Sequence, residues 1–184
     1  MRIIESNRRW AVVAVTILVS ILAIVPAGCK RHRRVTLLTN EEAPALASVV
    51  ATADPHAAAQ FVSGFYGVEQ NAWRWTAGKF SVLLRPPRAA AVSGAILQLK
   101  FTIPAVAMSK MKGVSLSASV NGAPLPPESY TQAGDFVYSR DVPANLLTGD
   151  VARVDFSLDK AMPATPADRR ELGLVVAMVG LQSK

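Results

Sequence analysis

The sequence has few of the residues that most often build catalytic or metal sites. Its only cysteine is Cys29, which excludes a disulfide within the chain. Its only histidines are His32 and His56. With two histidines, neither a Ser-His-acid triad nor a histidine-rich metal site is easily assembled. We therefore predict that the protein uses no metal and no cofactor.

Short catalytic motifs are also missing from the sequence. It contains no glycine-rich phosphate loop, no nucleophile elbow and no metalloprotease helix motif. One route to catalysis stays open, a carboxylate pair for glycoside hydrolysis, because acidic residues are available in the second part of the chain. Most of these acids occupy turn-like or alternating surface positions, where they ordinarily serve solubility. We predict a protein that is not an enzyme, with a glycoside-active enzyme as the remote alternative.

An excess of positive charge is absent from most of the chain. The formal net charge is +7, but residues 1–34 hold seven of the twenty Lys and Arg and one of the thirteen acids. The remaining residues are therefore close to neutral, which argues against nucleic acid as a partner. The basic cluster Lys30, Arg31, Arg33 and Arg34 instead suits a membrane surface, where each cation gains about 1 kcal/mol from anionic headgroups.

The most conspicuous feature that is present is an apolar run over residues 11–28. Arg8 and Arg9 precede this run, and the basic cluster follows it. A helix of this length spans about 27 Å, close to the minimum for a hydrocarbon core of roughly 30 Å. We predict an N-terminal hydrophobic helix within a segment 1–34 that attaches the protein to membrane lipid, in the cell membrane or envelope.

Three interpretations of this leader stay open. Residues 25–29, Val-Pro-Ala-Gly-Cys, resemble a bacterial lipobox, in which the cysteine is acylated, so Cys29 is a lipidation candidate. The second interpretation is an ordinary signal peptide that is cleaved before Gly28. The third is an uncleaved transmembrane anchor. Three basic residues before the run face four after it, so the positive-inside rule does not fix the orientation.

The part of the chain after the leader has the pattern of a β-protein. Residues 35–59 are rich in alanine and interrupted by prolines, which predicts a tether with at most a short helix. Later segments alternate between apolar and polar residues, as half-buried strands do. Residues 114–120 are the clearest case, because serines alternate with apolar residues and Asn121-Gly122, a strong hairpin turn, follows. Further strands are predicted over 80–84, 97–103, 154–159 and 172–181.

The spacing of these segments predicts the fold. Turn signals at 85–87, 124–127 and 133–135 separate the strands at short intervals. About eight strands, with no long helix and no parallel crossover unit, favour an all-β fold. We predict an antiparallel β-sandwich, jelly-roll-like, over residues 60–184.

Two segments carry a resemblance to known domains. Residues 64–76 read Gly-Phe-Tyr-Gly-Val-Glu-Gln-Asn-Ala-Trp-Arg-Trp-Thr, and residues 168–173 read Asp-Arg-Arg-Glu-Leu-Gly. The first resembles the opening strand pair, and the second the closing pattern, of β-sandwich domains of poorly characterised role that are attached to bacterial glycosyltransferases and envelope-polysaccharide proteins. The resemblance implies a bacterial envelope domain that lies outside the cytoplasm.

Residues 64–76 have a structural and a functional interpretation. In the first, Tyr66 and Trp75 anchor the core while Glu69 and Arg74 pair across a turn. In the second, Trp73 or Tyr66 stacks on a sugar ring while Glu69 and Arg74 bind its hydroxyls. Trp73 and Trp75 share one face of a strand, so both are expected in the same environment. We predict an interaction or carbohydrate-binding-like module whose partner is envelope polysaccharide or another envelope protein. The alternative is a structural envelope protein without sugar affinity.

Overall fold

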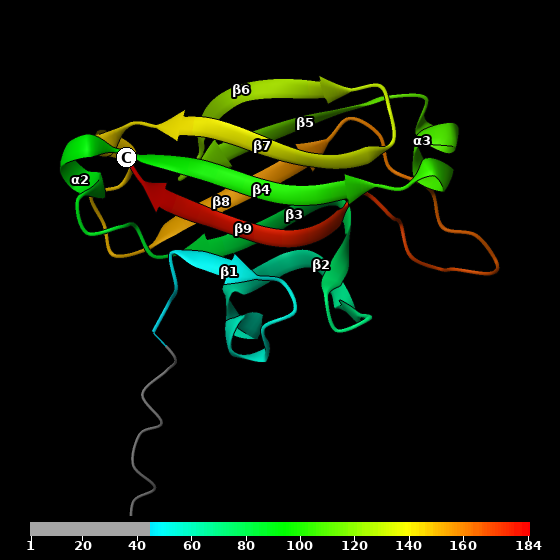
Figure 1. Ribbon diagram of the computed structural model, residues 1–184, viewed down its shortest axis with the longest axis horizontal. Coiled ribbons are helices and arrows are strands. Elements are labelled where there is room, and N and C mark those ends of the chain that lie inside the picture. The colour runs from blue at the N-terminus through cyan, green and yellow to red at the C-terminus, as the bar shows by residue number, and fades with distance from the viewer. Residues whose placement is uncertain (1–44) are drawn as a thin grey trace, which may run out of the picture. The chain divides into compact units, whose positions relative to one another are not determined.

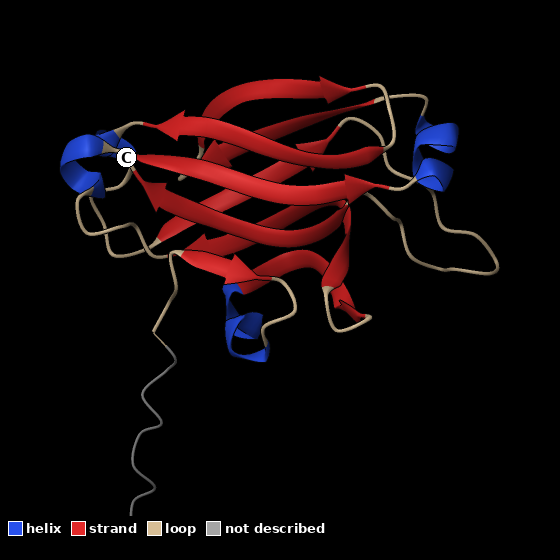
Figure 2. Ribbon diagram, in the orientation of Figure 1, coloured by secondary structure: helices blue, strands red, loops and turns tan. Residues whose placement is uncertain are grey.

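The computed structural model of the chain describes residues 45–184, and they form an antiparallel β-structure (Figures 1 and 2). The predicted hydrophobic helix and basic cluster lie outside the described residues. The strands are β1 Val49–Ala51, β2 Phe61–Glu69, β3 Trp73–Leu84, β4 Ala95–Ile103, β5 Val114–Val120, β6 Ala123–Tyr130, β7 Gly134–Val142, β8 Ala152–Leu158 and β9 Val175–Ser183. The helices are α2 Ala90–Ser93, α3 Ala105–Met111 and the 3-10 turns η1 Pro55–Gln60 and η2 Ala144–Leu146.

The nine strands belong to one hydrogen-bonded sheet that folds into two layers. Its main path runs β6-β5-β8-β3-β9-β4-β7, while β1 pairs with β9 and β2 pairs with β3. Strand β3 joins the layers, because its residues 74–75 pair with β9 and its residues 79–84 pair with β8. In Figure 1, β7, β4 and β9 lie in front of β5, β8 and β3. The predicted all-β antiparallel sandwich is confirmed.

Strand β5 has the bounds that alternation predicts. Its apolar residues are buried, its serines lie on the opposite face, and the Asn121-Gly122 turn follows with positive φ angles of 50° and 84°. Both positions of a type I′ turn require positive φ, which Asn and Gly tolerate better than other residues. The pattern therefore identifies β5 and the turn that follows it.

The turn predicted over residues 124–127 is wrong, because these residues lie inside β6. Strand β6 ends the main path of the sheet and pairs only with β5. Proline cannot donate a hydrogen bond to a neighbouring strand, and an edge strand does not need that bond on its outer side. The carbonyl of Pro126 accepts bonds from Tyr138 Oη (2.9 Å) and Arg140 Nε (2.8 Å). The prolines thus mark an edge strand.

The sandwich begins earlier in the chain than residue 60. Residues 49–59, expected to be part of the tether, contain β1 and most of η1, and Val50 is buried. Strand β3 pairs with β9 only at Val175 and Val176, so the rest of that edge of β9 can accept β1, whose Val50 lies opposite Val179. Thr52 Oγ1 also donates to the carbonyl of Val176 (2.6 Å).

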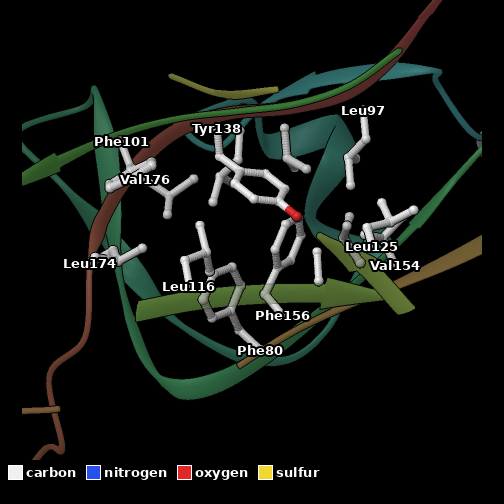
Figure 3. Packing of buried hydrophobic residues seen from close by; sticks show 14 of the residues in the cluster. Phe80, Leu97, Phe101, Leu116, Leu125, Tyr138, Val154, Phe156, Leu174 and Val176 are labelled. Carbon is white, nitrogen blue, oxygen red and sulfur yellow. The ribbon is translucent and has the colours of Figure 1, made fainter. Parts of the chain in front are cut away.

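Aliphatic and aromatic side chains fill the core between the two layers (Figure 3). Phe80 of β3 and Phe156 of β8 are stacked, with ring centroids 4.9 Å apart. They face Leu97 of β4 and Tyr138 of β7, both fully buried. Burial raises the pKa of Tyr138, whose hydroxyl is satisfied by the edge carbonyl of β6. Because buried polar groups without partners are costly, this bond helps to fix β7 against β6.

Candidate functional site

The β2–β3 hairpin turns through Gln70 and Asn71. Both have positive φ, 51° and 54°, and the Ala72 amide donates to the Glu69 carbonyl (3.1 Å). Positive φ at both central positions is a feature of type I′ turns, which fit the twist of paired strands. The turn places Glu69 directly opposite Trp73. Directly opposed residues of an antiparallel pair project from the same face, so an acidic and an aromatic side chain are neighbours here.

Two tryptophans occupy that face of β3. Trp73 and Trp75 are half-buried, and their rings meet edge to face with centroids 6.4 Å apart. Edge-to-face contact is a favoured aromatic geometry, and it holds both rings in place. As expected for two residues on one face, Trp73 and Trp75 have the same burial class. Neither belongs to the fully buried core.

Arg170 connects this hairpin to the segment between β8 and β9. Its Nη1 lies 2.8 Å from Glu69 Oε1, and its Nη2 lies 2.8 Å from Asp168 Oδ2. Its Nε donates to Asp168 Oδ1 (3.0 Å), which makes that pair bidentate. The guanidinium also lies over the Tyr66 ring, 5.3 Å from its centroid. Glu69 therefore pairs with Arg170, and the predicted pairing of Glu69 with Arg74 is wrong.

A second set of contacts holds the same segment against β2 and β3. The Tyr66 hydroxyl donates to the carbonyl of Glu171 (2.7 Å), and the Gly78 amide donates to Glu171 Oε2 (3.2 Å). Gly78 has room for this carboxylate because an added Cβ would lie 3.2 Å from Glu171 Oε1. The two sequence segments that carried the resemblance, 64–76 and 168–173, are thus in direct contact.

The charges of this cluster are mutually compensated. The hydrogen bonds from Arg170 lower the pKa of Asp168 to about 2. The hydrogen bonds that Arg170 donates to Asp168 and Glu69 raise the pKa of Arg170 above its usual range. A general acid for glycoside hydrolysis needs a raised carboxyl pKa, so the shift at Asp168 runs against that role. This cluster suits the fixed orientation of charged groups better than proton transfer.

Arg74 has a structural environment that the sequence did not predict. Its Nε donates to the Thr52 carbonyl (2.7 Å) and its Nη1 donates to the Tyr66 carbonyl (2.8 Å). The guanidinium lies over the Phe61 ring at 5.2 Å. Through these contacts, Arg74 of β3 joins β2 and the segment after β1 to its own strand. Of the four predicted ligand residues, Tyr66 and Glu69 contact Arg170, and Trp73 lies opposite Glu69. Arg74 instead bonds the carbonyls of Thr52 and Tyr66.

Sequence reasoning missed the central residue of this site. Arg170 and Asp168 were noted only as part of a closing pattern, because nothing in the sequence joins them to Glu69, 101 residues from Arg170.

The lipidation candidate Cys29 and the basic cluster Lys30, Arg31, Arg33 and Arg34 lie outside the described residues. Within residues 45–184, no helix is long and apolar enough to span a bilayer. The same part of the chain contains no cluster of three potential metal-ligating side chains among His, Cys, Asp and Glu.

Comparisons with known proteins add little to this geometry. No family model and no curated protein matches the chain. One similar solved structure is described as "CBM4 structure and function", with 11% sequence identity and a TM-score of 0.31, covering 73% of this chain and 85% of that chain. A TM-score this low places the chain in no family and transfers no ligand to it.

Proposed function

We propose that residues 45–184 form a non-catalytic carbohydrate-binding module, and that residues 1–34 attach it to a membrane of the bacterial envelope. The observation that carries the binding proposal is the partly exposed Trp73, which lies on one face with Trp75 and directly opposite Glu69. Aromatic rings beside fixed polar groups suit a pyranose, which has an apolar ring face and polar edges.

The contacts of Tyr66 and Trp73 differ, and they decide which ring can stack on a sugar. Arg170 covers one face of the Tyr66 ring, and the Tyr66 hydroxyl is already bonded to Glu171. Tyr66 is therefore a poorer stacking platform than the sequence suggests, and Trp73 is the expected platform. Glu69 keeps its second carboxylate oxygen available for a sugar hydroxyl, because its ion pair to Arg170 uses Oε1.

Binding of the full-length chain to envelope polysaccharides tests this proposal. Trp73→Ala is expected to weaken binding by about tenfold or more, while Trp73→Tyr keeps most of the affinity, because stacking needs an aromatic ring. Val137→Ala is the matched control, since Val137 is exposed on the distant strand β7. No binding by the wild-type chain would favour the structural envelope protein, and equal binding by Trp73→Ala would exclude Trp73 as the stacking platform.

A further inference from the structure

A second surface of the molecule has the properties of a small-ligand site. A pocket of about 310 Å³ lies between α3 and the segment that connects β8 to β9. Val106 and Lys110 line it from α3, and Met162, Pro163 and Leu172 line it from the connecting segment. Its volume falls at the lower end of the range for small-molecule sites, which are typically apolar with a few polar groups.

The pocket is held open by hydrogen bonds of the connecting segment itself. Met162 and Leu172 exchange two backbone bonds, 2.8 and 2.9 Å long, so their side chains lie at the neck of the loop. The Thr165 amide donates to the Asp168 carbonyl (2.7 Å), and the Asp168 amide donates to Thr165 Oγ1 (3.1 Å). A site that is formed in advance avoids the entropic cost of ordering the loop when a ligand binds.

One cation of the pocket has no partner in the part of the chain that the structure describes. Arg170, which also lines the pocket, is committed to Asp168 and Glu69. Lys110 has neither an ion pair nor a side-chain hydrogen bond among residues 45–184, and it lies one helical turn after Val106 on the same side of α3. The pocket therefore combines an apolar wall with one available positive charge.

We propose that this pocket binds a small amphipathic monocarboxylate, whose aliphatic part contacts Val106, Met162 and Leu172 and whose carboxylate pairs with Lys110. A single ammonium group matches a single negative charge, and the Asp168 carboxylate at the same pocket disfavours a dianion such as a phosphate monoester. This site is separate from the glycan surface, although Arg170 takes part in the structure of both.

A methyl NMR titration of the full-length chain, labelled at the methionine methyl groups, tests the proposal. Hexanoate is the probe, and hexanamide, hexyl phosphate and glucuronate are the comparisons. We expect a saturable shift of the Met162 methyl resonance with hexanoate, assigned through Met162→Leu. Binding is expected to weaken by about tenfold in Lys110→Gln, because a bond to a charged group is lost. Lys112→Gln is the matched control, since Lys112 is exposed and does not line the pocket.

The comparison ligands separate recognition of the carboxylate charge by Lys110 from apolar binding alone. Hexanamide must bind more weakly than hexanoate if Lys110 recognises charge, and hexyl phosphate must not bind more tightly. Val106→Trp, at a position that is 60% exposed and tolerant of a larger side chain, should fill the pocket and remove the shift. A shift that never saturates, or equal affinities for Lys110→Gln and Lys112→Gln, would overturn the proposal. Glucuronate, with its polar ring, should not shift Met162, so failure here is distinguishable from failure of glycan binding at Trp73.

Discussion

At the scale of single residues, Arg170 joins parts of the chain that are far apart in sequence. It holds Glu69 of the hairpin, Asp168 of its own segment and the face of the Tyr66 ring. A planar guanidinium can satisfy two carboxylates and an aromatic face at once, whereas an ammonium group cannot reproduce that geometry. Arg170→Lys is therefore not a conservative change at this position.

The protonation of Asp168 is the first measurable consequence. Its pKa is about 2 in the folded chain, below its ordinary value of 3.8, chiefly because Arg170 bonds its carboxylate. A lowered folded-state pKa stabilises the fold above the unfolded-state value, and this contribution disappears as the pH falls from about 3.8 to about 2. Carboxyl-carbon NMR should show Asp168 titrating near 2, and near its ordinary value in Arg170→Ala. A wild-type midpoint close to 4 would contradict the assigned bidentate pair.

At the scale of elements, strand β2 is bent by irregular pairing with β3. The register shifts three times between Phe61 and Val68, and Gly64 lies within this region with a φ of +73°. A Cβ at residue 64 would collide with the Lys79 carbonyl. The bend carries the hairpin toward the segment that contains Arg170, so Gly64 contributes to the site without touching it.

Gly64→Ala is expected to destabilise the domain by about 1–3 kcal/mol, because it adds both backbone strain and a steric clash. Gly67→Ala is the matched control in the same strand, since no atom lies within 4 Å of an added Cβ there. Thermal unfolding of the two variants in the full-length chain should show a lower Tm only for Gly64→Ala. Equal melting temperatures would mean that the bend is not required.

The elements also show where sequence patterns succeed. Residues 114–120 alternate between apolar and polar, and the sheet has one buried and one wet face there, so the period identifies β5 with its bounds. Strand β6 was missed because three prolines are compatible with an edge strand as well as with a turn. Strand β1 was missed because three residues are too few to show a period, and only the open edge of β9 selects them.

At the scale of the whole molecule, a nearly neutral sandwich follows a basic and apolar leader. The leader was predicted from a local run of residues, and its membrane role stays a prediction. Tyr66 and Trp73 of the hairpin were also predicted as ligand residues from a local cluster of aromatic residues. The part of the site that involves Arg170 could not be predicted, because the fold alone brings Glu69 and Arg170 together across 101 positions.

The membrane proposal has a direct test in the full-length protein. The protein should fractionate with membranes and be released by detergent, because the lipid-anchored and transmembrane interpretations both require attachment. The intact mass of the extracted protein then separates these two. A chain that starts at an acylated Cys29 indicates a lipid anchor, and an unmodified chain that starts at Met1 indicates a retained helix. A protein found entirely in the soluble fraction would contradict membrane attachment.

If the hairpin face that bears Trp73 binds carbohydrate, the indole resonances of the full-length chain report this binding directly. The chain has three tryptophans, so Trp73→Phe and Trp75→Phe assign the two signals of the sandwich. Titration with the envelope polysaccharide that binds should shift the Trp73 indole signal saturably, with a midpoint equal to the measured dissociation constant. Saturable binding that leaves the Trp73 signal unmoved would contradict carbohydrate binding at this face.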